Sequence, residues 1–229
     1  MKKTLSHLIS HVRGEHYCIS ESLTFRDILT FLGERFIMLL RGLLTKPILS
    51  VARRVFLGRG VKIRGQRNIN FLGGISLHDF SSLDGISENK NQVGANFSLG
   101  SNSRIVTTSV MSQLGKGFSI GDNVGINDFC YVGAQGGISI GSDTIIGPYT
   151  SIFSENHDIR GESHIIRLNR CIRRSVSVGK NCWLGAHVVI LAGSQIGDNV
   201  VVAAGAIVNG VIADNSVVTG YNKVRNRNV

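Results

Sequence analysis

The second half of the chain repeats every six residues, and this period constrains its fold more than any other feature. An aliphatic residue recurs without a break at Val178, Leu184, Ile190, Ile196, Val202 and Val208. Four positions after the first five of these lie compact residues, namely Cys182, Val188, Ser194, Val200 and Ala206. A six-residue period fits neither an α-helix nor a single strand. It is the signature of a parallel β-helix, whose coils each contain three short strands around an aliphatic core.

The same spacing continues upstream with one interruption. It runs from Ile120 to Ile138, slips by two residues, and restarts at Ile140. Weaker matches around residues 63–105 extend it further, so we expect about five to six coils at three repeats per coil. No hexapeptide occurs between about residues 156 and 175. We expect this segment to leave the coil as a loop, and long loops on rigid scaffolds often carry function.

The N-terminal segment has a different pattern, so we divide the chain into a helical extension, 1–58, and a β-helix domain, 59–229. From Phe25 to about Arg54 the apolar residues follow the spacing of an amphipathic helix. Thr24 and Asp27 resemble a capping box, and Pro47 is expected to kink or end the helix. Two interpretations stay open. The helix packs on the solenoid or a neighbouring subunit, or it lies on a membrane with its basic side toward anionic lipid.

The composition of the chain argues against several classes of function. The 229 residues carry a formal net charge of +10, but charges interrupt every apolar window of residues 25–54, so no membrane span is expected. Nucleic-acid binding is not favoured, because aromatic residues are few and no binding motif is present. Cys130 and Cys182 fall at inward positions, and the four cysteines form no disulfide framework. The start lacks a signal-peptide core, so we expect a cytoplasmic protein, or one peripheral at the inner face of the cell membrane.

Two short stretches within the repeats resemble a known family. The stretches are Asn156-His157-Asp158 and Asn181-Cys182-Trp183-Leu184-Gly185-Ala186, within hexapeptides that run from Ile120 to Ala206. Together they resemble the hexapeptide-repeat acyltransferases, and among these the galactoside, maltose and surface-polysaccharide O-acetyltransferases. The resemblance covers about residues 93–224. It implies an all-β, left-handed parallel β-helix, acetyl-CoA as acyl donor, a sugar or polysaccharide hydroxyl as acceptor, and a homotrimer with its active site between two subunits.

The resemblance also assigns site residues. His157 would be the general base, since an imidazole can take the proton of a hydroxyl that is too weak an acid to attack a thioester unaided. Asn127 and Gln135 would contact the acceptor, although the sugar acetyltransferases hold an Asp at the second position. The predicted donor-binding residues are Trp183, Gly185, Ala186, Ala204 and Lys223. The backbone N–H of Gly185 or Ala186 would lie nearest the developing oxyanion. The group that orients His157 stays open among Glu155, Asp158 and Glu162.

Three alternatives remain beside this hypothesis. An amino-sugar N-acetyltransferase would use the same base and donor. A γ-carbonic-anhydrase-like zinc enzyme needs three histidines with two of them five residues apart, whereas His157, His164 and His187 are 7 and 23 apart. No metal site is therefore expected. A solenoid that only binds or scaffolds is the third alternative, because the expected cofactor end departs from the family pattern.

Overall fold

The computed structural model describes residues 2–13, 17–49, 54–220 and 223–226, and it divides into two units, residues 1–37 and 38–229. The predicted helix beyond residue 49 includes residues 50–53, which lie outside the described part. Within the described residues, no helix is long and apolar enough to cross a membrane.

Two helices precede the coil. They are α1 (Lys2–Arg13), which the sequence analysis missed, and α2 (Phe25–Leu49). The predicted capping box is confirmed, because Asp27 Oδ2 accepts from the Thr24 amide at 2.9 Å and Thr24 Oγ1 accepts from the Asp27 amide at 3.2 Å. The hydrogen bonds from Thr24 lower the pKa of Asp27. Pro47 does not end the helix, since α2 continues for two residues beyond it.

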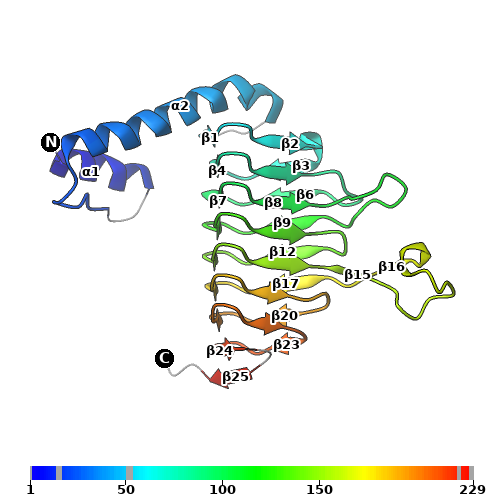
Figure 1. The fold of residues 1–229 in the computed structure, drawn as a ribbon. Coiled ribbons are helices and arrows are strands. Elements are labelled where there is room, and N and C mark those ends of the chain that lie inside the picture. The colour runs from blue at the N-terminus through cyan, green and yellow to red at the C-terminus, as the bar shows by residue number, and fades with distance from the viewer. Residues whose placement is uncertain (1, 14–16, 50–53, 221–222, 227–229) are drawn as a thin grey trace. The chain divides into compact units, whose positions relative to one another are not determined.

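The coil consists of three sheets of short strands, which we call A, B and C (Figure 1). Sheet A contains β1 (Val55–Leu57), β4 (Ile75–Leu77), β7 (Phe97–Leu99), β10 (Gly125–Ile126), β13 (Ile145–Ile146), β18 (Trp183–Leu184), β21 (Val201–Val202), β24 (Ser216–Thr219) and β25 (Lys223–Asn226). Sheet B contains β2 (Lys62–Arg64), β5 (Ser82–Asp84), β8 (Arg104–Val106), β11 (Tyr131–Gly133), β14 (Ser151–Phe153), β19 (Val189–Ile190) and β22 (Ile207–Val208). Sheet C contains β3 (Ile69–Phe71), β6 (Asn91–Val93), β9 (Phe118–Ile120), β12 (Ile138–Ile140), β17 (Val176–Val178), β20 (Gln195–Ile196) and β23 (Val211–Ile212).

The chain visits the three sheets in turn, and successive coils pair in parallel, as Ile126 with Ile146 and Ile146 with Leu184 show. Sheets B and C each hold seven described strands, so the described coil has seven full turns, more than the five to six expected. The first strand begins at Val55, inside the segment assigned by sequence to the helical extension. Seven parallel turns with the hexapeptide period form the left-handed parallel β-helix that the sequence predicts.

The core contains the residues that the period predicts. At most 1% of each of these residues is exposed, both for the aliphatic residues Leu184, Ile190, Val202 and Val208 and for the compact residues Val188, Ser194, Val200 and Ala206. Cys182 and Cys130 are buried thiols, as expected. The undercount of coils arises early in the chain, where polar residues such as Asp84 and Asn91 replace aliphatic ones at buried positions.

The turns between sheets form three edges along the coil, which we call AB, BC and CA. At the CA edge, asparagines with positive φ stack into a ladder in which Asn181 donates to Asn199 at 2.9 Å and Asn199 donates to Asn215 at 3.0 Å. At the AB edge, Phe129, Tyr149 and His187 all have φ near 60° and their rings stack at 5.0 and 4.8 Å. Positive φ is uncommon for bulky residues, and here it repeats on successive turns of the coil.

Two long excursions leave the coil at the BC edge. The first, residues 107–117, connects β8 to β9, and we call it the upper loop. The second connects β14 to β17 and contains the antiparallel strands β15 (Glu155–His157) and β16 (Cys171–Arg173) with the 3-10 turn η2 (Ile166–Leu168) between them. We call it the hairpin; it is the loop predicted at about 156–175. A further 3-10 turn, η1 (Gln66–Asn68), lies at the BC turn of the first coil.

Candidate functional site

The hairpin holds the predicted base, His157, outside the coil. Its cross-strand pairs place Glu155 opposite Arg173, Asn156 opposite Ile172 and His157 opposite Cys171. The His157 side chain is exposed, and its Nδ1 lies 4.0 Å from the Cys171 sulfur. Because strand pairing fixes the backbone on both sides, the imidazole projects from an ordered element rather than from an irregular loop.

Two of the three carboxylates considered as orienting partners, Glu155 and Asp158, bond to other groups. Glu155 Oε2 accepts from Arg173 Nε at 3.3 Å, and Asp158 lies 3.7 Å from Arg170 Nε. Asp158 Oδ1 also accepts from the Arg160 amide at 3.0 Å. Within the described part of the chain, Cys171 is the one side chain that meets a ring nitrogen of His157. Sequence reasoning missed this contact because it depends on the register of the hairpin.

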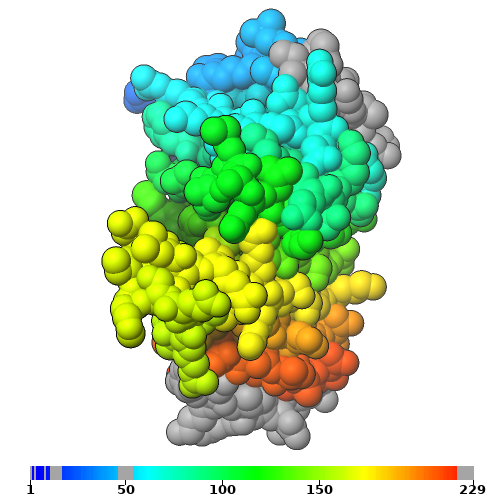
Figure 2. All heavy atoms as spheres, turned by 90° about the vertical axis from the view of Figure 1, so that its right-hand side faces the viewer, coloured from blue at the N-terminus to red at the C-terminus, as the bar shows by residue number. Residues whose placement is uncertain are grey.

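Arg173 connects the hairpin to the upper loop. Its guanidinium contacts Glu155 within the hairpin, and it donates to the carbonyl oxygens of Leu114 at 2.6 Å and Gln113 at 3.2 Å. In Figure 2 the green upper loop adjoins the yellow hairpin on the face shown, in agreement with these bonds. One signal for the upper loop is present in the sequence, because Ile105 and Ile120 lie fifteen residues apart instead of six.

Gln135, the second predicted acceptor contact, lies at the base of both excursions. Its side chain is only 4% exposed and donates to Ser109 Oγ of the upper loop at 2.9 Å. Its backbone oxygen accepts from the Lys116 amide at 2.9 Å, and Lys116 pairs with Glu88 at 2.5 Å. Gln135 therefore supports the upper loop beside the hairpin.

Three of the predicted donor residues, Gly185, Ala186 and Ala204, lie on the AB edge. Trp183 lies on the outer face of sheet A, 57% exposed, and it pairs with Ile145 and Val201 on the neighbouring strands. Ala186 and Ala204 follow one another along the edge, where the Gly205 amide donates to the Ala186 oxygen at 2.8 Å. A Cβ at Gly185 would lie 2.6 Å from the Ala204 backbone nitrogen. The glycine is therefore required by the close approach of adjacent coils, and the alanines leave the edge shallow.

Backbone hydrogen bonding distinguishes the two amides that could stabilise the oxyanion. The Gly185 N–H donates to the Val202 oxygen at 2.7 Å, so the coil itself uses it. Of the two candidates, Ala186 is the one left for a ligand. Lys223 belongs to β25 and pairs with Thr219, one coil beyond the Ala203–Ala204 turn; only its backbone is described.

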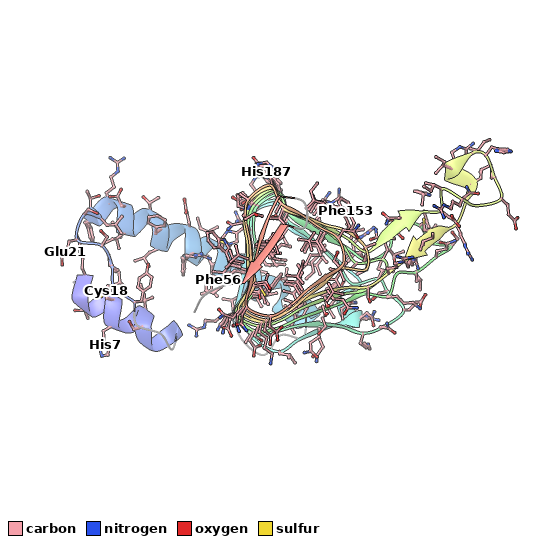
Figure 3. The ribbon with its side chains drawn as sticks, turned by 90° about the horizontal axis from the view of Figure 1, so that it is seen from below. His7, Cys18, Glu21, Phe56, Phe153 and His187 are labelled. Atoms are coloured by element: carbon pink, nitrogen blue, oxygen red, sulfur yellow. The ribbon has the colours of Figure 1, made fainter. Side chains whose placement is uncertain are left out.

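One copy of the chain does not bring the predicted site together. Asn127 lies on the AB edge with three of the predicted donor residues, whereas His157 and Gln135 lie on the BC edge. Figure 3 looks along the coil and shows His187 at one corner, with Phe153 near the different corner from which the hairpin leaves. The strands of sheet B separate these corners by about 15–20 Å, at roughly 3.3 Å per residue. Among the described residues, no cluster of three His, Cys, Asp or Glu side chains could hold a metal ion.

Comparisons with known proteins agree with this architecture. Residues 175–210 match the model of the bacterial transferase hexapeptide family (six repeats). The chain is 31% identical over 148 residues to the putative acetyltransferase YJL218W of Saccharomyces cerevisiae, covering 64% of this chain and 74% of that protein.

A second relative matches over a smaller part of both chains. The chain is 35% identical over 106 residues to WbbJ of Escherichia coli, a putative lipopolysaccharide biosynthesis O-acetyl transferase, and it spans about half of that relative's length (54%). Among solved structures, the N-acyltransferase AntD of Bacillus cereus, in complex with dTDP and 3-hydroxybutyryl-CoA, has the same fold, with a TM-score of 0.51, 16% identity, and coverage of 81% of this chain and 85% of AntD. The period, the coil and these matches show that the chain belongs to the family of hexapeptide-repeat acyltransferases.

Proposed function

We propose that the protein is an acetyl-CoA-dependent O-acetyltransferase that acts on a sugar hydroxyl of a surface polysaccharide or its precursor. The observation that carries this proposal is the exposed imidazole of His157, held by a paired hairpin at the edge of a coil of this family. The likeness to an O-acetyl transferase named for lipopolysaccharide biosynthesis supports the acceptor class.

The chemistry needs a base, an oxyanion contact and a leaving group. The acceptor oxygen forms a bond to the thioester carbonyl carbon while His157 takes the hydroxyl proton, a contribution of about 10²–10⁴ in rate. The carbonyl oxygen gains negative charge that a backbone N–H stabilises, and Ala186 is the candidate donor. As the C–S bond breaks, the imidazolium gives this proton to the CoA sulfur, which leaves as the free thiol. Transfer is direct, so no covalent enzyme intermediate is needed.

The AB edge fits the extended arm of a CoA donor. Ala186 and Ala204 project only methyl groups, and a Cβ at Gly205 would meet open space. A narrow, largely apolar arm can therefore lie along the turns beside the exposed Trp183 ring, which offers apolar area for contact. Lys223 would supply a charge for a CoA phosphate near the end of the coil.

A homotrimer would complete the site. Because the base and the donor residues occupy different edges, the BC edge of one copy must face the AB edge of another for transfer to occur. A head-to-tail contact of this kind gives a closed ring of three when it relates neighbouring copies by 120°. The outer face of sheet C carries serines such as Ser119, Ser139 and Ser177, whereas the AB edge exposes Phe129 and Tyr149. The apolar edge is the better candidate for burial between copies.

The test is acetyl-CoA cleavage by the purified protein with a panel of sugars, amino sugars, oligosaccharides and bacterial polysaccharides, read as released CoA. Acceptor-dependent release should fall by about 10² or more in His157→Ala, the loss expected for a general base. His164→Ala, which removes another exposed histidine of the hairpin, is the matched control and should stay near wild type. Release with amino sugars alone would establish N-acetylation instead. If no CoA is released and calorimetry detects no CoA binding, the result would contradict acyl transfer and favour a solenoid that only binds or scaffolds.

A further inference from the structure

Helix α2 carries a continuous exposed apolar stripe. Six of the nine large apolar residues that are exposed on the described part of α2 form this stripe, and they are 42–59% exposed: Phe25, Leu29, Leu32, Phe36, Leu40 and Leu43. Their spacing of three or four residues keeps them on one face, and eighteen residues at 1.5 Å each give a stripe of about 27 Å. These six side chains are all exposed in the described part of the chain.

The charges around the stripe indicate the kind of partner that it fits. At 100° per residue, Arg26 and Arg35 lie on either side of the stripe, about 80–100° from Phe25. The two acidic residues of α2, Asp27 and Glu34, lie near the opposite face, and Asp27 is held there by its bonds to Thr24. The sequence of α1, in contrast, contains no acidic residue. An apolar face with basic flanks is complementary to a layer of anionic headgroups above acyl chains.

We propose that the stripe binds the surface of an anionic phospholipid bilayer, with α2 parallel to the membrane plane. The apolar side chains enter the boundary between headgroups and acyl chains, and Arg26 and Arg35 lie at the level of the phosphates. The helix does not span the bilayer, since no described helix is long and apolar enough for that. This proposal does not depend on acyl transfer and can fail or succeed separately from it.

The experiment is sedimentation of the full chain with vesicles of phosphatidylcholine alone and of phosphatidylcholine with phosphatidylglycerol. Phe36→Ser removes one ring from the stripe, and Phe31→Ser removes an equally exposed ring about 140° away on the same helix (59% and 62% exposed). We expect binding to anionic vesicles that weakens with added salt. Phe36→Ser should lower the partition coefficient about tenfold, and Phe31→Ser by no more than about twofold.

The contradicting results are equally specific. Absence of wild-type binding to both vesicle types overturns the proposal, as does an equal loss in the two Phe variants. A change in the mass of the Phe36→Ser protein by sedimentation velocity would show that a second copy, not lipid, covers the stripe. Because both rings are exposed, circular dichroism should be unchanged in both variants.

Discussion

Replacement of Arg173 by alanine tests whether the contacts of its side chain hold the upper loop in an ordered position against the hairpin. The guanidinium makes three contacts, to Glu155 and to the Gln113 and Leu114 carbonyl oxygens, and the Arg173 side chain is only 22% exposed. Hydrogen bonds from charged groups contribute about 1.5–3 kcal/mol each in favourable cases. With partial exposure and incomplete additivity, we expect the variant to lose about 3 kcal/mol of local ordering free energy.

Hydrogen exchange followed by mass spectrometry measures this loss directly. The amides of Gly115 and Lys116 are bonded at the base of the upper loop, to Thr108 Oγ1 and to the Gln135 oxygen. A loss of about 3 kcal/mol corresponds to roughly 100-fold faster exchange for them. Coil peptides around residues 195–218 should exchange as in wild type, because Arg173 does not touch them.

Two controls sharpen the result. Arg174→Ala removes the neighbouring exposed arginine and should leave the upper loop unchanged. Arg173→Lys should restore only part of the protection, because an ammonium group lacks the planar fork that reaches both carbonyls. Unchanged exchange at Gly115 in Arg173→Ala would refute the coupling. Faster exchange throughout the coil would show that Arg173 stabilises the whole fold instead.

Three further predictions concern the core, the thiols and the upper loop. Leu184→Ala should cost about 3 kcal/mol, because Leu184 is fully buried, and should lower Tm by about 6–12 °C, whereas a shift under about 2 °C would mean that the coil relaxes around the cavity. Burial raises the pKa of Cys130 and Cys182, so both thiols should resist iodoacetamide in the folded protein, and rapid labelling of either would contradict this. Their contribution to the free energy of unfolding should be complete below the usual thiol pKa and should be lost as the pH rises through the raised pKa of the folded state. Gly115→Ala should speed tryptic cleavage within the upper loop, because its Cβ would overlap the Thr107 carbonyl oxygen, and an unchanged cleavage rate would contradict that packing.

The period predicted the coil well because every sixth residue must enter the same narrow prism. The inward positions of Leu184 and Ala206 and the buried thiol of Cys182 follow from that rule alone. The cap of α2 was equally readable, since Thr24 and Asp27 interact three residues apart. The spacing of residues along the sequence therefore predicted the parts of the structure that depend on local or strictly repeated contacts.

Contacts between excursions could not be predicted in the same way. Arg173 bonds to Leu114 across 59 positions of the sequence, and only the stacking of coils brings the two segments to the same edge. The position of Gln135 beneath the upper loop has the same origin. Which edge each site residue occupies follows from the number and length of the turns, and polar core residues such as Asn91 obscured that count early in the chain.

A subunit-mixing experiment tests whether His157 of one copy acts with the donor edge of another. His157→Ala removes the base, and Ala204→Trp fills the shallow AB edge at an exposed position, so each variant alone should be inactive. The two variants carry different tags, are co-expressed, and are purified through both tags. In a closed trimer one interface of three then pairs an intact base with an intact donor edge, so we predict about one third of wild-type CoA release. Mixed oligomers as inactive as the separate variants, or full activity of His157→Ala alone, would contradict the account.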